Sequence, residues 1–282
     1  MRKILPNSEL VSILKCPKCG SSMEIQNGAS LICNGIRRHC YDFASSGYIN
    51  LMPPGYSDSG DSKAAVRARK EFLDLELYRP AAEALAEALS EYLPAGAKVI
   101  DAGCGEGYYT AFLAKKGFLT AGADISKSAA EATAKRAAAT GVEHGFFCVG
   151  SVFELPFADA SADAVVNIFA PCAEGEFSRV LRKGGILAVM YAGTDHLMGL
   201  KRAIYDVAHE NDERADMPKD MKLLEQRRVK FGITVKGNTS VMNLFAMTPY
   251  YWRTSASDSE KLRDIEALET EVDMMIAIYQ KQ

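Results

Sequence analysis

The feature that most constrains the fold is an apolar run that ends in an acidic residue and is followed by closely spaced glycines. The run spans residues 97–101, and three glycines then alternate with other residues: Gly103, Gly105 and Gly107. Residues 109–114 have the composition of a helix. Glycine reaches backbone angles that other residues avoid, so the chain can turn sharply and a ligand can approach the main chain. The pattern predicts a strand, a tight loop and a helix whose unpaired N–H groups face a ligand.

Two acidic residues at the ends of successive predicted strands narrow the choice of ligand. A dinucleotide-binding loop places two residues between its second and third glycines, whereas one residue separates Gly105 from Gly107. Asp101 ends the first strand, where a carboxylate repels phosphates and can hold an amino group. Asp124 ends the second strand, where it can accept hydrogen bonds from ribose hydroxyls. The loop resembles the S-adenosylmethionine (SAM) loop of class I methyltransferases, with a nicotinamide site and a ligand-free glycine turn as alternatives.

The composition excludes several classes of protein. Hydrophobic residues make up 48% of the 282 residues, enough for a large α/β domain and a smaller module. No apolar run approaches the ~20 residues that span a membrane, and the N-terminus lacks the apolar segment of a secretory signal. We therefore predict a cytoplasmic protein with no membrane partner. The net charge of −3 disfavours bulk duplex binding, so contact with RNA would need local basic patches.

Four of the seven cysteines lie in one short N-terminal segment. Cys16 and Cys19 form a C-x-x-C turn followed by glycine, and Cys33 ends a β-like run. With either His39 or Cys40 they supply the four ligands of a tetrahedral zinc ion. A redox C-x-x-C is the alternative, but it lacks the βαβ setting that such a motif needs. Metal binding would be the main stabiliser of a segment this small.

A second motif follows the zinc segment and makes the resemblance specific. Residues 39–51 read H-C-Y-D-F-A-S-S-G-Y-I-N-L, an alternation typical of a hairpin. Together with the zinc segment and D-A-G-C-G-E-G-Y-Y at residues 101–109, it resembles the bacterial large-subunit rRNA guanine-N1 methyltransferases. The resemblance implies SAM and structural zinc as cofactors and a 23S rRNA hairpin loop as partner. It favours His39 over Cys40, although the loop before His39 is longer than in the family.

We expect the chain to have three parts. Residues 1–52 would form a zinc-ribbon RNA-recognition module, and residues 53–96 a linker with basic and alanine-rich helices. Residues 97–282 would form a class I SAM-methyltransferase domain, α/β and Rossmann-like, with a mostly parallel sheet covered by helices on both faces. Residues 182–185 read as a turn, and residues 265–279 as either helix or strand. A homodimer is left open.

Further site residues come from strand ends and from the resemblance. The family implies that Tyr78 and His196 contact SAM. Ser151 and Val152 follow the third strand and are candidates for the adenine pocket. The complete predicted SAM set is Tyr78, Asp101, Gly103, Gly105, Glu106, Gly107, Asp124, Ser151, Val152, Asn167 and His196.

The catalytic residues are less defined. Methyl transfer to guanine N1 requires loss of the N1 proton, and Asp195, Glu174 or solvent could take it. Phe169, at the end of a buried strand, could either stack on the target base or belong to the core. A basic helix at residues 63–73 places Lys63, Arg67 and Lys70 on one face, as a phosphate contact or as an ordinary solvated surface. A small-molecule SAM methyltransferase and a non-catalytic zinc-dependent RNA-binding protein are the rival functions.

Overall fold

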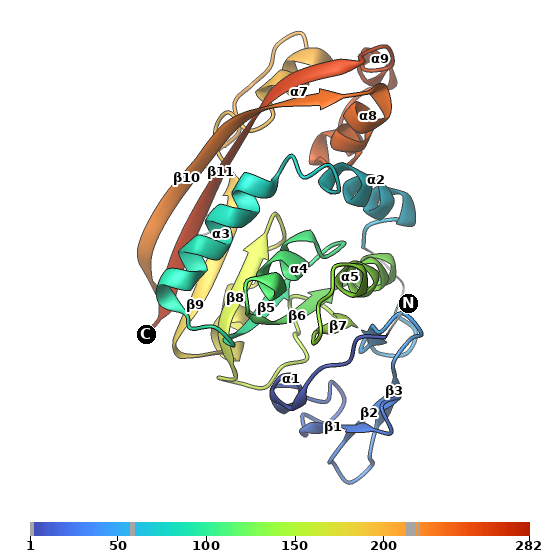
Figure 1. The fold of residues 1–282 in the computed structure, drawn as a ribbon, viewed down its shortest axis with the longest axis vertical. Helices are drawn as coiled ribbons and strands as arrows, with labels where there is room; N and C mark the ends of the chain where they lie inside the picture. The colour runs from blue at the N-terminus through green and yellow to red at the C-terminus, as the bar shows by residue number, and fades with distance from the viewer. Residues whose placement is uncertain (1–2, 57–59, 213–217, 219) are drawn as a thin grey trace.

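Figure 1 shows the computed structural model, which describes residues 3–56, 60–212, 218 and 220–282. Within these residues the main sheet has eight strands in the order β10-β11-β9-β8-β5-β6-β7-β4. Their bounds are β4 (Ile49–Asn50), β5 (Lys98–Ala102), β6 (Leu119–Asp124), β7 (Phe146–Val149), β8 (Ala162–Ile168), β9 (Leu181–Ala192), β10 (Met221–Lys236) and β11 (Ala267–Lys281). Adjacent strands from β4 to β9 are parallel, and β11 is antiparallel to both neighbours. The expected α/β class with a mostly parallel sheet is confirmed.

The apolar residues of the central strands divide between the two faces of the sheet. In β8, Ala164 and Val166 join one buried cluster, and Val165 between them joins the other. A parallel strand buried on both faces reads as a continuous apolar run, as this one does. One face is covered by α3 (Arg79–Tyr92) and α4 (Tyr108–Lys115), beside α2 (Lys63–Leu73) and α5 (Lys127–Ala139) (Figure 1). The other face packs α1 (Ser8–Ser12) and α6 (Glu174–Val180).

The N-terminal module is a small antiparallel sheet joined to the edge of the large one. Its strands are β1 (Met23–Gln26), β2 (Ser30–Cys33) and β3 (Cys40–Asp42). The predicted hairpin turn follows β3, and then β4 adds to the main sheet by parallel pairing with β7. The N–H of Ala158 also donates to the carbonyl of Ile13 at 2.8 Å. The predicted residues 1–52 therefore contain the three ribbon strands and one strand of the main sheet.

Two sequence readings change in the structure. Residues 182–185 were expected to form a turn but lie inside β9, where the register with β8 shifts between Ala162 and Ala164. Gly184, at φ +73°, accommodates this irregularity. The undecided final segment is β11, whose buried middle pairs with strands on both sides.

The remaining elements gather at one end of the long β10–β11 pair. They are α7 (Met198–Ile204), α8 (Asn238–Ala246), the 3₁₀ turn η1 (Pro249–Trp252) and α9 (Ala256–Glu260) (Figure 1). Among the described residues, each helix is too short or too polar to span a membrane.

Candidate functional site

The glycine loop between β5 and α4 is held in close contact with two neighbouring elements. All three glycines have positive φ, +86° at Gly103, +56° at Gly105 and +84° at Gly107. A Cβ at Gly103 would lie 2.5 Å from the Cβ of Ala170, and one at Gly107 would lie 2.6 Å from Thr133 Cγ2. Side chains at these positions would push the loop away from the turn after β8 and from α5.

Asp101 closes β5 with one carboxylate oxygen left unpaired. The residue is 2% exposed, and its Oδ2 accepts a hydrogen bond of 2.5 Å from Thr110 Oγ1. Its buried Oδ1 has no partner in the described part of the chain. Burial raises the pKa of Asp101 to about 7. An unpaired buried carboxylate oxygen is costly without a donor, so this position fits an ammonium group such as that of SAM.

Asp124 closes β6 and orders the loop from the opposite side. Its carboxylate accepts the N–H of Gly105 at 2.9 Å and the N–H of Ser126 at 2.8 Å. Burial raises the pKa of Asp124. Each carboxylate oxygen accepts one of these bonds and retains a further lone pair, which suits ribose hydroxyls.

Three aromatic side chains meet at the carboxyl end of β8. Phe169 is 51% exposed and has φ +50°, which is uncommon for a bulky residue. Its ring stacks on His196, with centroids 5.6 Å apart and planes at 26°. Tyr78 packs edge-on to His196 at 6.2 Å, and its buried hydroxyl has no partner among the described residues. Because it is half exposed, Phe169 is not a core residue, and its ring is available for stacking.

His196 is held by the backbone of β11. Its Nδ1 accepts the N–H of Asp273 at 3.2 Å, which leaves the proton of the neutral ring on Nε2. Burial lowers the pKa of His196 to about 4, so the ring is neutral at physiological pH. The Asp273 carboxylate accepts the N–H of Asp195 at 2.9 Å and binds Arg228 through contacts of 2.8 and 2.7 Å. This fully buried carboxylate therefore ties together the turn before His196 and strand β10.

Several predicted residues have other partners. The carboxylate of Glu106 forms a buried ion pair with Arg136 at 2.8 Å. Glu106 therefore anchors the glycine loop to α5, which carries Arg136. Asn167 donates its amide to the carbonyls of Ala102 and Pro171 at 3.1 and 3.2 Å. Asp195 pairs with Lys230 at 2.5 Å.

The remaining adenine and base candidates lie in the loop after β7 and at the start of α6. Ser151 Oγ accepts the N–H of Phe153 at 3.2 Å in the turn after β7. Val152 is buried near the glycine loop, 3.9 Å from where a Cβ at Gly103 would lie. Glu174 is the first residue of α6.

Helix α2 lies over the glycine loop and contributes a residue that the sequence reasoning missed. Arg69 approaches Gly105, where an added Cβ would lie 3.5 Å from Arg69 Nη1. Arg69 pairs with Asp61 at 2.5 Å, and Ser126 Oγ donates to the Asp61 carbonyl at 2.8 Å. The predicted basic face is largely neutralised, because Arg67 pairs with Glu71 and Lys70 with Asp74. Arg69 is not on the helix face that holds Lys63, Arg67 and Lys70, so the spacing of basic residues does not point to it.

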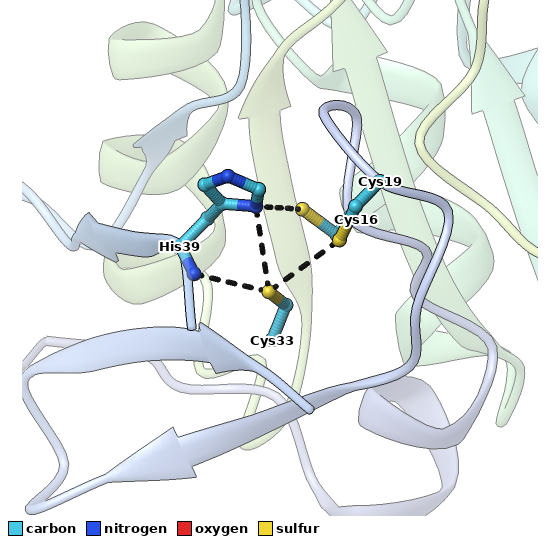
Figure 2. Close-up of side chains that lie close together, drawn as sticks. All are labelled: Cys16, Cys19, Cys33 and His39. Carbon is cyan, nitrogen blue, oxygen red and sulfur yellow. Dashed lines mark hydrogen bonds between the residues drawn. The ribbon is translucent and has the colours of Figure 1, made fainter. Parts of the chain in front are cut away.

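The N-terminal cysteines form a compact metal-binding cluster (Figure 2). The ligand atoms of Cys16, Cys19, Cys33 and His39 all lie within 4.8 Å of one another. His39 Nδ1 is 3.5 Å from Cys16 Sγ and 3.6 Å from Cys33 Sγ. Cys40 is exposed, and its sulfur instead contacts Asp42 at 3.9 Å. Successive side chains in a strand alternate sides, and His39 is the neighbour that faces the cluster. Three thiolates and one imidazole suit structural zinc.

Comparisons with known proteins agree with this arrangement. A family described as a methyltransferase domain matches residues 93–246, and one described as RlmA, N-terminal, a zinc ribbon, matches residues 14–59. The 23S rRNA (guanine(748)-N(1))-methyltransferase of Streptomyces fradiae is 33% identical over 203 residues, 69% of each chain. A Micromonospora griseorubida protein, provisionally named as a 23S rRNA (guanine-N(1)-)-methyltransferase, is 30% identical over 87% of this chain and 89% of its own. A Bacillus subtilis protein with the same provisional name is 26% identical over 96% and 98%.

Proposed function

The chain belongs to the 23S rRNA (guanine-N1)-methyltransferase family, and from this premise we propose that it methylates N1 of a guanine in a hairpin loop of 23S rRNA. It is a SAM-dependent methyltransferase with a structural zinc ribbon. We further propose that it acts in the cytoplasm. The homodimer stays a prediction.

The predicted cofactor residues have separate tasks in this proposal. SAM supplies an activated methyl group when bound. The unpaired Oδ1 of Asp101 would accept its ammonium group, and Asp124 would accept its ribose hydroxyls. Tyr78 and His196 would line the site from the side of β8, where the ring of Phe169 is exposed.

The target guanine would enter over Phe169. Base–aromatic stacking is worth about 1–3 kcal/mol per base, and Phe169, which is 51% exposed, could provide it. A neutral His196 behind this ring adds no positive charge beside the sulfonium. Asp195 pairs with Lys230, and Glu174 begins α6 on the chain that follows Phe169. Asp195, Glu174 and solvent stay the candidates for taking the N1 proton.

The observation that supports an RNA substrate most directly is the position of the zinc ribbon. The ribbon continues into β4, which extends the sheet beside β7, and the adenine-pocket candidates Ser151 and Val152 follow β7. Sequence-specific recognition of RNA favours loops whose bases are splayed out. A module at the sheet edge could hold such a loop while one base reaches Phe169. This mode of binding needs only a small contact area with the RNA, so it is compatible with the net charge of −3.

The test is transfer of labelled methyl groups by the purified protein. Ribosomal RNA that lacks the modification and a small-molecule extract are incubated separately with labelled SAM. The proposal predicts label on the RNA and none in the extract. Label only in the extract would favour the small-molecule enzyme, and RNA binding without any transfer would favour the non-catalytic protein.

A further inference from the structure

A cavity lies where the zinc ribbon meets the methyltransferase domain, and of its lining residues the proposed function has used only Ser151. Its volume is about 160 Å³. One side is formed by Pro17, Lys18 and Tyr41 of the ribbon, and the other by Ser151, Glu154 and Pro156 after β7. This volume is smaller than the ~300–1,000 Å³ of pockets for drug-sized ligands. It suits a single planar ring system.

The walls of this cavity are fixed relative to each other. Lys15, next to the zinc ligand Cys16, donates its N–H to the carbonyl of Pro156 at 3.0 Å. The N–H of Leu51 donates to the carbonyl of Val149 at 3.1 Å, where β4 joins β7. These hydrogen bonds attach both walls of the cavity to the sheet that carries Asp101 and Asp124. A group bound in the cavity would therefore have a fixed position relative to the cofactor loop.

The lining of the cavity is mostly apolar, with one positively and one negatively charged side chain. Tyr41, three prolines, Leu51 and Met52 line it, and the Tyr41 hydroxyl lies 3.6 Å from Cys16 Sγ. Lys18 and Glu154 both line it as well, and neither charged group has a partner within the described residues. Unpaired charges of both signs in the lining of an apolar cavity suit a ligand with both an anionic and a hydrogen-bond-donating part.

A nucleotide has this combination of groups. The ring of a base would fill the apolar part, its N–H groups would donate to Glu154, and its phosphate would pair with Lys18. Guanine fits best, because N1–H and the N2 amino group lie side by side and match a carboxylate. Phe153, between two residues that line the cavity, is 64% exposed and offers a stacking surface beside it.

We propose that this cavity binds a second nucleobase of the substrate RNA loop, guanine by preference, and so fixes which guanine reaches Phe169. The inference rests on the proposed function, because it assumes an RNA substrate. It adds a specificity site between the ribbon and the domain. Through Tyr41, the zinc cluster would shape one wall of this site.

The experiment uses the full-length zinc-loaded protein and a set of hairpin RNAs taken from the rRNA. In each RNA one loop base other than the methylated guanine is replaced by an abasic site. RNA affinity, by fluorescence anisotropy, and methyl transfer are measured for the wild type, Glu154→Gln, Lys18→Gln and Phe153→Ser. Glu143→Gln is the matched control, because Glu143 is also exposed and lies just before the opposite end of β7. SAM affinity checks that each variant is folded.

For the wild type, one abasic position is expected to weaken RNA binding roughly 5- to 150-fold, the range of a bidentate base contact. Glu154→Gln should weaken binding of the intact hairpin by a similar factor, leave SAM affinity unchanged and lose the sensitivity to that position. Glu143→Gln should behave as the wild type.

Two outcomes would overturn the inference in distinguishable ways. If the wild type binds and methylates the hairpin while all three cavity variants match it on every RNA, the inference fails and the proposed function stands. If the wild type neither binds nor methylates any rRNA hairpin, the proposed function fails and the inference fails with it.

Discussion

Replacing Gly103 by alanine tests whether the cofactor loop must touch the turn after β8. Gly103 has φ +86°, and a left-handed conformation costs an ordinary residue about 1–2 kcal/mol. The new Cβ would also lie 2.5 Å from the Cβ of Ala170, whereas carbon atoms pack at about 3.5–4.0 Å. Relieving that overlap requires a shift of about 1 Å, and overpacking of this kind costs about 1–3 kcal/mol. We therefore expect the free energy of unfolding to fall by about 2–5 kcal/mol.

Gly96→Ala is the matched control for the backbone contribution. Gly96 has φ +81°, but a Cβ there would meet no atom within 4 Å. Its cost should be the backbone part alone, about 1–2 kcal/mol, or a few degrees in Tm. SAM affinity should be unchanged in Gly96→Ala and reduced at least tenfold in Gly103→Ala, because the displaced turn carries Phe169. Thermal unfolding and isothermal titration calorimetry measure the two effects.

A second substitution isolates the collision itself. Ala170→Gly removes the methyl group that the new Cβ would meet, so the double variant Gly103→Ala/Ala170→Gly should recover the overpacking part of the loss and much of the SAM affinity. Comparison with Ala170→Gly alone completes the double-mutant cycle. A stability loss in Gly103→Ala no larger than that in Gly96→Ala, or no recovery in the double variant, would refute a required contact between the loop and the turn after β8.

Three further predictions concern the charges and the metal. Burial raises the pKa of Asp101 from 3.8 to about 7, so the contribution of this group to stability is present below pH 4 and is lost as the pH rises through 7. Because its charged form binds the ammonium group, SAM affinity should rise from pH 6 to 8 in titrations of the wild type and show no such rise in Asp101→Asn, and a flat wild-type profile would contradict this. Cys16→Ser should release about one zinc ion per chain, measured by elemental analysis, and weaken RNA binding more than SAM binding, whereas full retention of zinc would count against the ribbon assignment. Asp273→Asn removes the charge paired with Arg228, a charge-assisted bond worth about 1.5–3 kcal/mol. It should lower kcat and raise the KM for SAM by loosening the turn before His196, and unchanged values of both would exclude this positioning role.

Elements specified by local sequence were predictable. Helix α2 has the bounds read from its composition, Lys63–Leu73, and its Ser62 cap accepts the N–H of Ala65. The strand–glycine–helix unit was also predicted, because the glycines and the apolar run are local signals. The zinc ligands Cys16, Cys19 and Cys33 followed from spacing, and the resemblance favoured His39 over Cys40. In the structure His39 lies with the three cysteines, just before the strand that begins at Cys40.

Elements specified by distant contacts were not predictable. Strand β4 has two residues, and only its pairing with β7 makes it part of the main sheet. The segment that became β11 is buried on both faces through much of its length, so its sequence carries no alternation that separates strand from helix. The stretch at residues 182–185 has the two glycines of a turn. The residues just before and just after it, Leu181 and Ile186, both pair with β8, which keeps the stretch within a strand.

The candidate site shows the same division. Both strand-end aspartates could be chosen from sequence, because strand ends are local features. The exposure of Phe169, its stacking on His196 and the attachment of that histidine to Asp273 join three separate parts of the chain. Arg69 was missed because its importance comes from lying over Gly105, which no spacing along its own helix reveals.

The most direct test of the central claim is mass mapping of methylguanosine in 23S rRNA from strains with and without the gene. The account predicts that one loop guanine carries a methyl group at N1 only when the gene is present, and that purified protein, SAM and the unmodified RNA restore it. An identical methylation pattern in the two strains, with no methyl transfer to the unmodified RNA in vitro, would contradict it.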